Sequence, residues 1–325
     1  EKGEIDFLIG THRLIQDDVN WPDLQMVVID EQHRFGVEQR GKLLGKGQQP
    51  HYVALSATPI PRSLALTLYA GFDIFQIKQK PPGRVPVKTI LKRNSNRDQV
   101  IEFALKRMAV NESVFWVFPW IEGEEDERSI LHMFDQFKKG PFKHTPISLI
   151  HGQMKADEIE DNLQAFRAGQ FHMLMATTIV EVGVDIPQAT VMVIESANQF
   201  GLSQLHQLRG RVGRNNRPGF CFMIADTDIG TQTLTRLRQF ESTEDGFEIA
   251  LTDLKQRGFG SLIGLTQAGV PRFLFGDPWQ HPDHLTRSRE ILEALTPDQK
   301  DTLAQWSTLY EKTHREDERD ATRKR

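Results

Sequence analysis

The segment from Gln204 to Arg214 (QLHQLRGRVGR) places Arg209, Arg211 and Arg214 within six residues. Arginine can bind phosphate oxygens through two parallel hydrogen bonds, and it stays charged at any physiological pH. Gly210 and Gly213 separate the arginines, and a backbone without Cβ can approach a polyanion closely or leave a helix there. Phosphate binding is therefore one interpretation of this segment. The other is an arginine-rich, solvated helix end.

The composition narrows the class of protein. With 325 residues, 38% of them hydrophobic and 26% charged, the chain has the length of about two globular domains. The formal net charge of −4 predicts that any nucleic-acid contact comes from local basic patches. One cysteine, Cys221, excludes an internal disulfide framework and favours a reducing compartment. No apolar run has the length of a membrane span, and because residue 1 is Glu we expect a longer gene product.

Acidic residues follow a short apolar segment near the N-terminus. Asp6–Thr11 and Met26–Ile29 each predict a buried strand, and the sequence DEQH begins at Asp30, directly after the second. Ligands of open α/β sheets bind beyond the carboxyl ends of strands. A carboxylate there can hold Mg²⁺, and a neighbouring glutamate can polarise an attacking water. The alternative is a polar strand exit that caps a helix.

A third apolar segment, Tyr52–Leu55, ends in Ser56, Ala57 and Thr58. Small hydroxyl residues at a strand end can relay hydrogen bonds between a nucleotide site and a second surface. Alternatively, Thr58 and the following proline open a helix over 60–70.

An α/β pattern follows residues 76–96, which we interpret as a linker because its adjacent prolines continue neither a helix nor a central strand. Short apolar segments then alternate with amphipathic helices, which predicts a mostly parallel sheet covered on both faces. The predicted strands are Ser113–Phe118, Ile147–Ile150, His172–Ala176, Thr190–Ile194 and Phe220–Ala225, and the predicted helices are Asp98–Met108, Glu127–Lys139 and Lys155–Ala168.

Two strand exits in this second pattern carry groups that suit a ligand. His151 and Gly152 follow one predicted strand, where a glycine lets backbone approach a ligand; a structural histidine is the alternative for His151. Thr177 and Thr178 follow another and lead into the loop 181–185. Hydroxyls and backbone amides suit a nucleic-acid backbone, and the acid of the loop suits a nucleotide ribose.

After residue 230 the pattern changes. Thr231–Glu241 and Phe247–Gln256 predict two helices, and a loop with several glycines follows over 257–269. This arrangement is typical of a mobile lever or of a C-terminal cap.

The last part of the chain has three features. His281–His284 has no cysteine partners nearby, so we predict a loop and not a zinc site. Thr296 and Pro297 predict the N-cap and first turn of a final helix. The mixed-charge segment 311–325 predicts a frayed, solvated end.

Taken together, these motifs resemble those of the superfamily 2 helicases, and within them the RecG family of branch-migrating DNA helicases. DEQH resembles the Walker B motif and Ser56-Ala57-Thr58 the coupling motif. Ala176–Pro187 resembles the fifth helicase motif, and Gln207–Arg214 the sixth, which carries the arginine finger. The phrases DEQHRFGVEQR, ATPIPRSLALT, PPGRVPVKT and FGLSQLHQLRGRVGR are similar to RecG sequences. The resemblance covers residues 1 to about 270, and more faintly to about 295.

The resemblance implies an α/β fold of two RecA-like parallel-sheet domains, the first incomplete, followed by a helical hairpin and C-terminal helices. The implied segments are 1–75 for the C-terminal part of the first domain, 76–96 for a linker, 97–230 for the second domain, 231–295 for a translocation hairpin and loop, and 296–325 for a C-terminal helix and tail.

The implied activity is ATP-driven remodelling of stalled forks and Holliday junctions in repair and recombination. Asp30 would hold Mg²⁺, Glu31 would orient the attacking water, and Arg211 and Arg214 would reach the γ-phosphate of ATP. The residues assigned to catalysis are Asp30, Glu31, Gln32, His33, Gln207, Arg211 and Arg214. Those assigned to coupling with ATP are Ser56, Ala57, Thr58, Gly183 and Asp185. Those assigned to DNA are Thr11, His12, His151, Gly152, Thr177 and Thr178, and those of the hairpin are Arg236, Arg257, Gly258, Gly260 and Gln267.

The resemblance also implies partners and a place in the cell. Branched or forked DNA is the expected substrate, a single-stranded DNA-binding protein is an expected partner, and a monomer in the bacterial cytoplasm, associated with the nucleoid, is the expected form.

The sequence departs from the family at several points. Phe259 stands in place of a proline and Ser261 in place of a glutamate, which predicts a less rigid loop. No G-x-x-x-x-G-K-[ST] phosphate loop occurs, and the wedge domain of the family is absent, so we expect this chain alone to be inactive.

Two alternatives stay open. One is a double-stranded DNA translocase of the transcription-repair coupling type, which shares the hairpin. The other is a DNA-binding relic that no longer hydrolyses ATP. The presence of Glu31, Arg211 and Arg214 favours an enzyme, because a pure binder has no chemical need for them.

Overall fold

The computed structural model of the chain describes residues 5–16, 23–30, 45–46, 50–56, 73, 75–77, 79, 85–121, 129–177, 186, 188–213, 217–257 and 282–307. By its internal contacts the chain divides into two compact units, one of residues 1–59 and 80–253, the other of residues 60–79 and 254–325.

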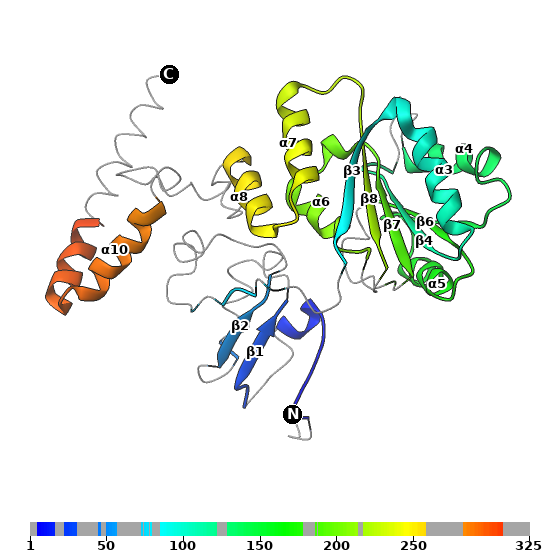
Figure 1. The fold of residues 1–325 in the computed structure, drawn as a ribbon. Coiled ribbons are helices and arrows are strands. Elements are labelled where there is room, and N and C mark those ends of the chain that lie inside the picture. Colours follow the sequence, from blue (N-terminus) through cyan, green and yellow to red (C-terminus); the bar gives the residue numbers. More distant parts are fainter. Residues whose placement is uncertain are drawn as a thin grey trace, which may run out of the picture. The chain divides into compact units, whose positions relative to one another are not determined.

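A six-stranded sheet forms the core of the first unit (Figure 1). Every neighbouring pair of strands is parallel, and the order is β3-β8-β7-β4-β6-β5. The strands are β3 (Val87–Arg93), β4 (Ser113–Val117), β5 (Ile147–Ile150), β6 (Met173–Ala176), β7 (Ala189–Ile194) and β8 (Gly219–Ala225). The predicted parallel sheet is therefore confirmed.

The outermost strand β3 lies inside the segment 76–96 that the sequence suggested as a linker. It pairs with β8 along its whole length, from Val87 opposite Gly219 to Arg93 opposite Ala225. An edge strand tolerates the lysines and the terminal arginine of this segment, because one of its sides has no neighbouring strand. The nearby prolines obscured this strand in the sequence.

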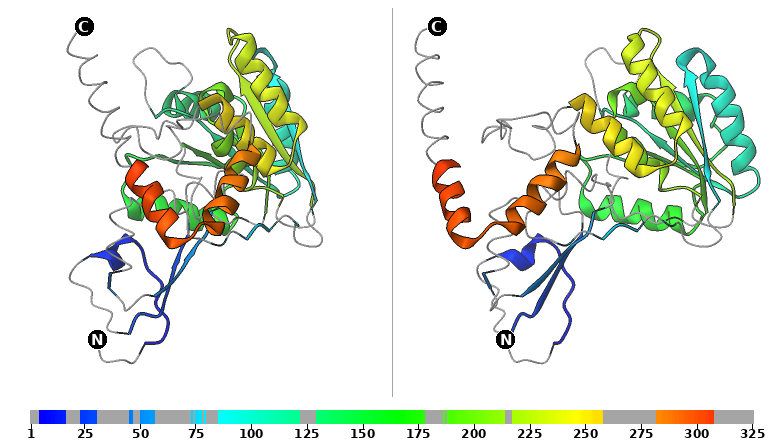
Figure 2. Two further views of the ribbon diagram at one scale, coloured as in Figure 1. Left: turned by 90° about the vertical axis from the view of Figure 1, so that its left-hand side faces the viewer. Right: turned by 60° about the vertical axis from the view of Figure 1, so that its left-hand side comes forward.

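Helices cover both faces of the sheet, as further views show (Figure 2). α3 (Arg97–Met108) and α4 (Ile130–Lys139) pack against one face, and α5 (Ala156–Arg167) and α6 (Leu202–Arg209) pack against the other. α7 (Thr231–Ser242) and α8 (Gly246–Arg257) contribute apolar side chains to the same core as α6. Strand β4 supplies both cores, because successive side chains of a strand point to opposite faces.

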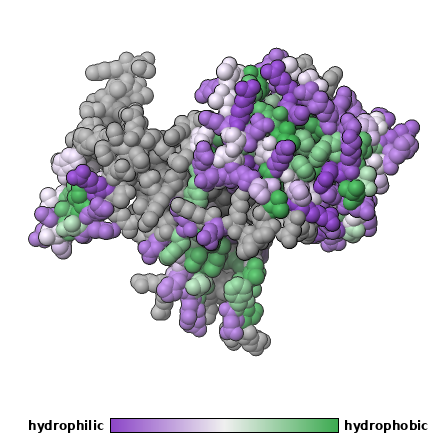
Figure 3. Space-filling view, in the orientation of Figure 1, coloured by the Kyte–Doolittle hydropathy of each residue, from purple (hydrophilic) through white to green (hydrophobic). Residues whose placement is uncertain are grey.

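A separate pair of parallel strands precedes this sheet in the chain. β1 (Met26–Ile29) pairs with β2 (His51–Ala54), with Met26 opposite His51. Apolar side chains of this pair, including Met26 and Val28, are exposed, and Figure 3 shows a hydrophobic surface over this part of the chain.

The predicted strand Asp6–Thr11 does not form. Its described backbone makes no strand ladder, and the short 3-10 helix η1 (His12–Ile15) follows it. Phe7 within it is 79% exposed. A run of apolar residues becomes a strand only where a neighbouring strand pairs with it, and the described residues offer none here.

The second unit contains two described helices, α10 (Pro282–Ala294) and a helix over 297–307. The predicted loop His281–His284 is therefore wrong from Pro282 onward, since a proline with fixed φ is favoured in the first helical turn. The predicted helix start at Thr296 is confirmed. The Thr296 backbone N–H donates to Oε1 of Gln299 at 2.9 Å, and the Gln299 N–H donates to Oγ1 of Thr296 at 3.4 Å.

No helix in the described part of the chain is long and apolar enough to cross a membrane.

Candidate functional site

α6 runs from the carboxyl ends of the strands of the six-stranded sheet (the carboxyl edge) towards their amino ends (the amino-terminal edge). It follows the carboxyl end of β7, and beyond its last turn the N–H of Gly213 donates to the carbonyl of Ala189 at the start of β7, at 3.4 Å. Gly213 has φ of 68°, and an added Cβ would lie 3.0 Å from Cγ2 of Val87 and 3.3 Å from Cα of Gly219. A side chain there would be strained and crowded. The segment around Arg211 therefore lies at the amino-terminal edge of the sheet, where β3, β7 and β8 begin.

Arg209 has a structural environment that the sequence did not indicate. It is 4% exposed, and its Nη1 donates to the carbonyls of Thr243 at 2.8 Å and Phe240 at 3.4 Å. Its guanidinium also lies 4.3 Å from the centre of the Phe240 ring. Burial lowers the pKa of Arg209 from its ordinary value. These carbonyls belong to the last turn of α7, where helix carbonyls lack intrahelical partners. Arg209 therefore holds the end of α7, and the phosphate interpretation does not apply to it.

Gln207 and Arg211 are both half-buried and lie four positions apart at the end of α6. Of the sixth-motif residues that were predicted to act in catalysis, these two are described by the structure. Arg214, the second predicted arginine finger, lies outside the described residues.

Three of the residues predicted to contact DNA, His151, Gly152 and Thr177, lie at the opposite, carboxyl edge. Ile150 of β5 pairs with Ala176 of β6, so His151 and Thr177 follow neighbouring strands at one level. The N–H of Thr177 donates to the carbonyl of Ile150 at 3.4 Å, and Gly152 comes next after His151. Nδ1 of His151 is buried and has no hydrogen-bond partner among the described residues. A buried polar atom without a partner is rare in proteins and is satisfied by a ligand or water.

A buried carboxylate at the carboxyl end of β7 was missed by the sequence analysis. Glu195 is 1% exposed, and its two carboxylate oxygens accept hydrogen bonds from Nε and Nη2 of Arg97, each at 3.0 Å. The indole N–H of Trp116 donates to the same carboxylate at 3.0 Å. Burial raises the pKa of Glu195, although Arg97 opposes the shift. A charged residue directly after an apolar strand is the signal that would have indicated this site.

The loop between β7 and α6 is fixed by a second polar network. Ser196 has a left-handed backbone (φ 44°, ψ 49°), which costs a non-glycine residue of order 1–3 kcal/mol. Its hydroxyl donates to Oδ1 of Asp226 at 2.8 Å, and the side-chain amide of Asn198 donates to Oδ2 of Asp226 at 2.9 Å. Nη2 of Arg236, on α7, donates to the carbonyl of Asn198 at 2.8 Å. Arg236 of the predicted hairpin therefore holds the loop that enters α6.

Asp253 on α8 caps the first turn of α6. It is 5% exposed, and its carboxylate accepts hydrogen bonds from the N–H of Leu202 at 3.3 Å and the hydroxyl of Ser203 at 2.9 Å. Such a carboxylate accepts from helix N–H groups that lack an intrahelical partner. Its negative charge is stabilised by the positive end of the helix dipole. The helical pair α7–α8 is therefore bonded to α6 at both of its ends.

The predicted Walker B and coupling motifs follow the two-stranded sheet. Asp30 follows β1 and Ser56 lies just beyond β2, and the N–H of Leu55 donates to the carbonyl of Ile29 at 2.8 Å. Because β1 and β2 are parallel neighbours, the exposed Asp30 and Ser56 lie at the same edge. A carboxylate and a hydroxyl are oxygen groups of the kind that suits Mg²⁺. No cluster of three or more metal-binding side chains occurs among the described residues.

Three further predicted site residues lie elsewhere in the described part of the chain. Thr11 is exposed and precedes η1, His12 begins η1, and Arg257 ends α8. The predicted site residues outside the described part of the chain are Glu31, Gln32, His33, Ala57, Thr58, Thr178, Gly183, Asp185, Arg214, Gly258, Gly260 and Gln267.

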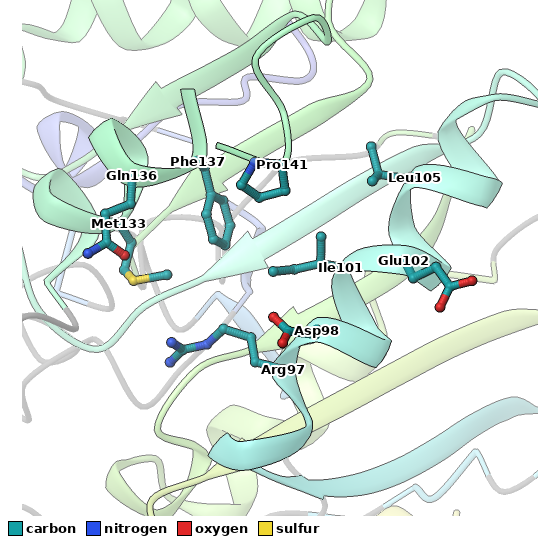
Figure 4. Close-up of a pocket in the computed structure, with 9 residues that line it drawn as sticks. All are labelled: Arg97, Asp98, Ile101, Glu102, Leu105, Met133, Gln136, Phe137 and Pro141. Carbon is teal, nitrogen blue, oxygen red and sulfur yellow. The ribbon is translucent and has the colours of Figure 1, made fainter. Parts of the chain in front are cut away.

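An open groove of about 430 Å³ lies between α3 and α4. Ile101 of α3 and Phe137 of α4 line it together with Arg97, as Figure 4 shows. Most of its lining is apolar, and Arg97 is already bonded to Glu195. The groove therefore offers no convergent set of catalytic groups.

Two protein-family models match the chain. The model for DEAD/DEAH box helicases matches residues 1–67, and the model for the helicase conserved C-terminal domain matches residues 88–216.

Curated relatives agree with these matches. The ATP-dependent DNA helicase RecG of Synechocystis is 43% identical over 295 residues, which cover 90% of this chain and 35% of the relative. The protein of the same name from Thermotoga maritima is 42% identical over 296 residues, which cover 90% of this chain and 38% of the relative. The chain thus spans little more than a third of the length of these relatives.

Solved structures show the same likeness. The structure of RecG bound to a three-way DNA junction matches with a TM-score of 0.65 at 42% identity, covering 80% of this chain and 34% of that one. Dbp5 of S. cerevisiae, bound to RNA and ADP BeF3, matches with a TM-score of 0.52 at 14% identity, which shows a shared fold alone.

Proposed function

Because the chain belongs to the RecG-type superfamily 2 helicases, we propose that it is the C-terminal part of an ATP-driven motor that remodels branched DNA. One observation carries the proposal. The arginine segment lies at the amino-terminal edge of the six-stranded sheet, His151 and Thr177 lie at its carboxyl edge, and α6 runs between the edges. A motor needs a nucleotide site and a DNA site on one body, and this separation of the two sets of residues supports that arrangement.

On the nucleotide side, Asp30 holds Mg²⁺ and Glu31 orients the attacking water. Arg211 and Arg214 donate to the γ-phosphate as negative charge spreads over its oxygens, which is worth about 10³–10⁵ in rate for an arginine finger. Mg²⁺ held by Asp30 would supply positive charge that offsets the negative charge of the ATP phosphates. The remaining motif residues sense the closed nucleotide site; they are Gln32, His33, Ser56, Ala57, Thr58, Gly183, Asp185 and Gln207.

On the DNA side, the carboxyl edge contacts the sugar-phosphate backbone. The buried Nδ1 of His151 needs a partner, which supports a hydrogen bond to a ligand at this place. Gly152 and Thr177 follow the same pair of strands and offer backbone amides and a hydroxyl of the kind that bind phosphates. Thr11, His12 and Thr178 extend this set.

The hairpin α7–α8 couples the two sides. Arg236 bonds the loop before α6, Asp253 caps the first turn of α6, and Arg209 at its last turn bonds the end of α7. A displacement of the hairpin, driven by Arg257, Gly258, Gly260 and Gln267, therefore acts on α6, whose last residue Arg209 lies two positions before Arg211.

The same reasoning leads us to propose the DNA substrate, the protein partner, the oligomeric state and the location in the cell. The substrate is a fork or a Holliday junction, and the motor acts as a monomer with a single-stranded DNA-binding protein as a partner. Its place is the bacterial cytoplasm, next to the nucleoid, which the bacterial relatives support. The RecG relatives favour this proposal over a transcription-repair coupling translocase.

The test uses the full-length protein that carries this chain. ATP hydrolysis is measured with no DNA, with linear duplex and with a three-way junction, and junction unwinding is followed on a gel. We expect the junction to stimulate hydrolysis most and to be unwound. Junction binding without hydrolysis would instead identify a DNA-binding relic, and stimulation by linear duplex without unwinding would identify a translocase.

A further inference from the structure

A basic cavity lies at the end of the carboxyl edge that is farthest from His151. It measures about 250 Å³ and is bordered by Lys92 and Arg93 from the end of β3, Asp226 after β8, and Arg238 and Glu241 from α7. The sheet order places β3 at one outer side and β5, which His151 follows, at the other. This cavity and His151 therefore stand at opposite ends of one edge.

The two carboxylates of the cavity already accept hydrogen bonds within the fold. Asp226 accepts from Ser196 and Asn198, one bond on each oxygen. Oε1 of Glu241 accepts from the backbone N–H of Leu91 at 2.7 Å.

Among the described residues, the cations of the cavity form no ion pair. No ion pair within the described part of the chain includes Arg93 or Arg238, and both side chains are exposed. Nζ of Lys92 donates to the neutral side-chain amide of Gln99 at 3.0 Å. Three cations against two carboxylates make the cavity attractive to an anion, and the planar guanidinium suits phosphate oxygens.

The spacing along the edge suggests which anion it binds. Neighbouring strands lie about 4.8 Å apart, so the five intervals from β5 to β3 span about 24 Å. Duplex DNA rises about 3.4 Å per base pair, so this span matches about seven base pairs.

We propose that the cavity of Lys92, Arg93 and Arg238 binds a backbone phosphate of duplex DNA, as a second contact about seven base pairs from the contact at His151 and Thr177. The proposal rests on the proposed function, since it extends the same DNA edge. A nucleotide is the other source of phosphate. The segment of Arg211, which we assign to the γ-phosphate of the nucleotide, lies at the opposite edge, which favours DNA as the ligand of the cavity.

The test measures binding of the 325-residue chain to hairpin-capped duplexes of about five and about twelve base pairs, shorter and longer than the seven base pairs deduced above. Fluorescence anisotropy gives the dissociation constants over a series of salt concentrations. The double variant Arg93→Gln/Arg238→Gln is compared with Lys139→Gln/Lys143→Gln, which removes the same charge from exposed positions near the amino-terminal edge. Circular dichroism confirms that each variant is folded.

The unaltered chain is expected to bind the longer duplex more tightly. The arginine variant should lose that gain, and its slope of log K against log salt should fall by about 1, since one phosphate contact contributes about 0.9. The lysine variant should keep both. Equal behaviour of the two variants would overturn the inference and leave the proposed function standing, whereas no binding of either duplex by the full-length protein, measured in the same way, would overturn both.

A second arm separates the sources of phosphate. Binding of a fluorescent ATP analogue is measured with the same variants in the full-length protein. Unchanged analogue binding by Arg93→Gln/Arg238→Gln supports DNA as the ligand. A loss of analogue binding by that variant would assign the cavity to the nucleotide and contradict the inference.

Discussion

The carboxylate of Asp253 on α8 accepts a hydrogen bond of 2.9 Å from the hydroxyl of Ser203 in the first turn of α6. The two residues are 50 positions apart, and the bond joins the predicted hairpin to the helix that ends at the arginine segment. Because this cap comes from α8, it fixes the start of α6 and also joins α6 to α8. A cap from a residue adjacent in the sequence would fix the start of α6 alone.

Replacing Asp253 with alanine should lower the free energy of unfolding by about 1 kcal/mol or more, as the loss of a helix cap does. The N–H of Leu202 would lose its buried acceptor. Urea denaturation followed by circular dichroism measures the change. Asp228→Ala, at an exposed turn, is the matched control and should change stability by less than about 0.5 kcal/mol. Equal effects of the two substitutions would contradict the capping role.

Replacing Arg209 with methionine should destabilise the domain by about 2–4 kcal/mol, because the carbonyls of Phe240 and Thr243 lose a buried donor. The change is again measured by urea denaturation. Arg211→Met, at a half-buried position, is the comparison and should cost much less. Similar stability of the two variants would mean that Arg209 does not hold the end of α7.

Replacing Arg211 with alanine in the full-length protein should reduce DNA-stimulated ATP hydrolysis by about 10³-fold or more, as expected for an arginine finger. DNA binding and the unfolding transition should stay unchanged. A coupled assay of ADP release measures the rate, and Arg167→Ala on the exposed side of α5 serves as the control. Turnover equal to that of the unaltered protein would rule out this role.

Glu195 should make stability depend on pH. Burial raises its pKa in the folded state, so the folded protein holds this proton more tightly than the unfolded chain. The contribution of Glu195 to stability is therefore full below its ordinary pKa of 4.5 and is lost as the pH rises through the raised value. Glu195→Gln removes that titration. Urea denaturation of both proteins across this range should show their stability difference shifting in favour of the variant as pH rises. A shift in the other direction would show that Arg97 outweighs burial.

Much of the fold was accessible from the sequence because the central strands are buried on both faces. Such strands read as continuous apolar runs, and those of β4, β5 and β7 agree with the predicted segments to within one residue at each end. Asp6–Thr11 has the same kind of run without a pairing strand in the described part of the chain, so the pattern alone was misleading there. β3 was hidden for the opposite reason, because an edge strand carries polar residues.

The site was accessible only in part. Motif resemblance predicted Gln207, Arg211, His151 and Thr177 as site residues, and the structure divides them between two edges of one sheet. Motif resemblance could not identify Glu195, Asp253 or the burial of Arg209, because the partners of these residues lie far away in the sequence and are brought close only by packing. The arginine spacing that suggested phosphate binding holds one residue whose role is purely structural. The predicted domain boundaries stay a prediction.

α6 is a short rod of eight residues, about 12 Å long, whose three leucines Leu202, Leu205 and Leu208 are almost fully buried. Sliding or tilting it within the domain would open cavities, and truncating one buried leucine already costs about 2–5 kcal/mol. α6 therefore has no independent freedom of motion. A force applied to α6 at either of its ends is therefore expected to move α6 and the six-stranded sheet together, as one rigid body.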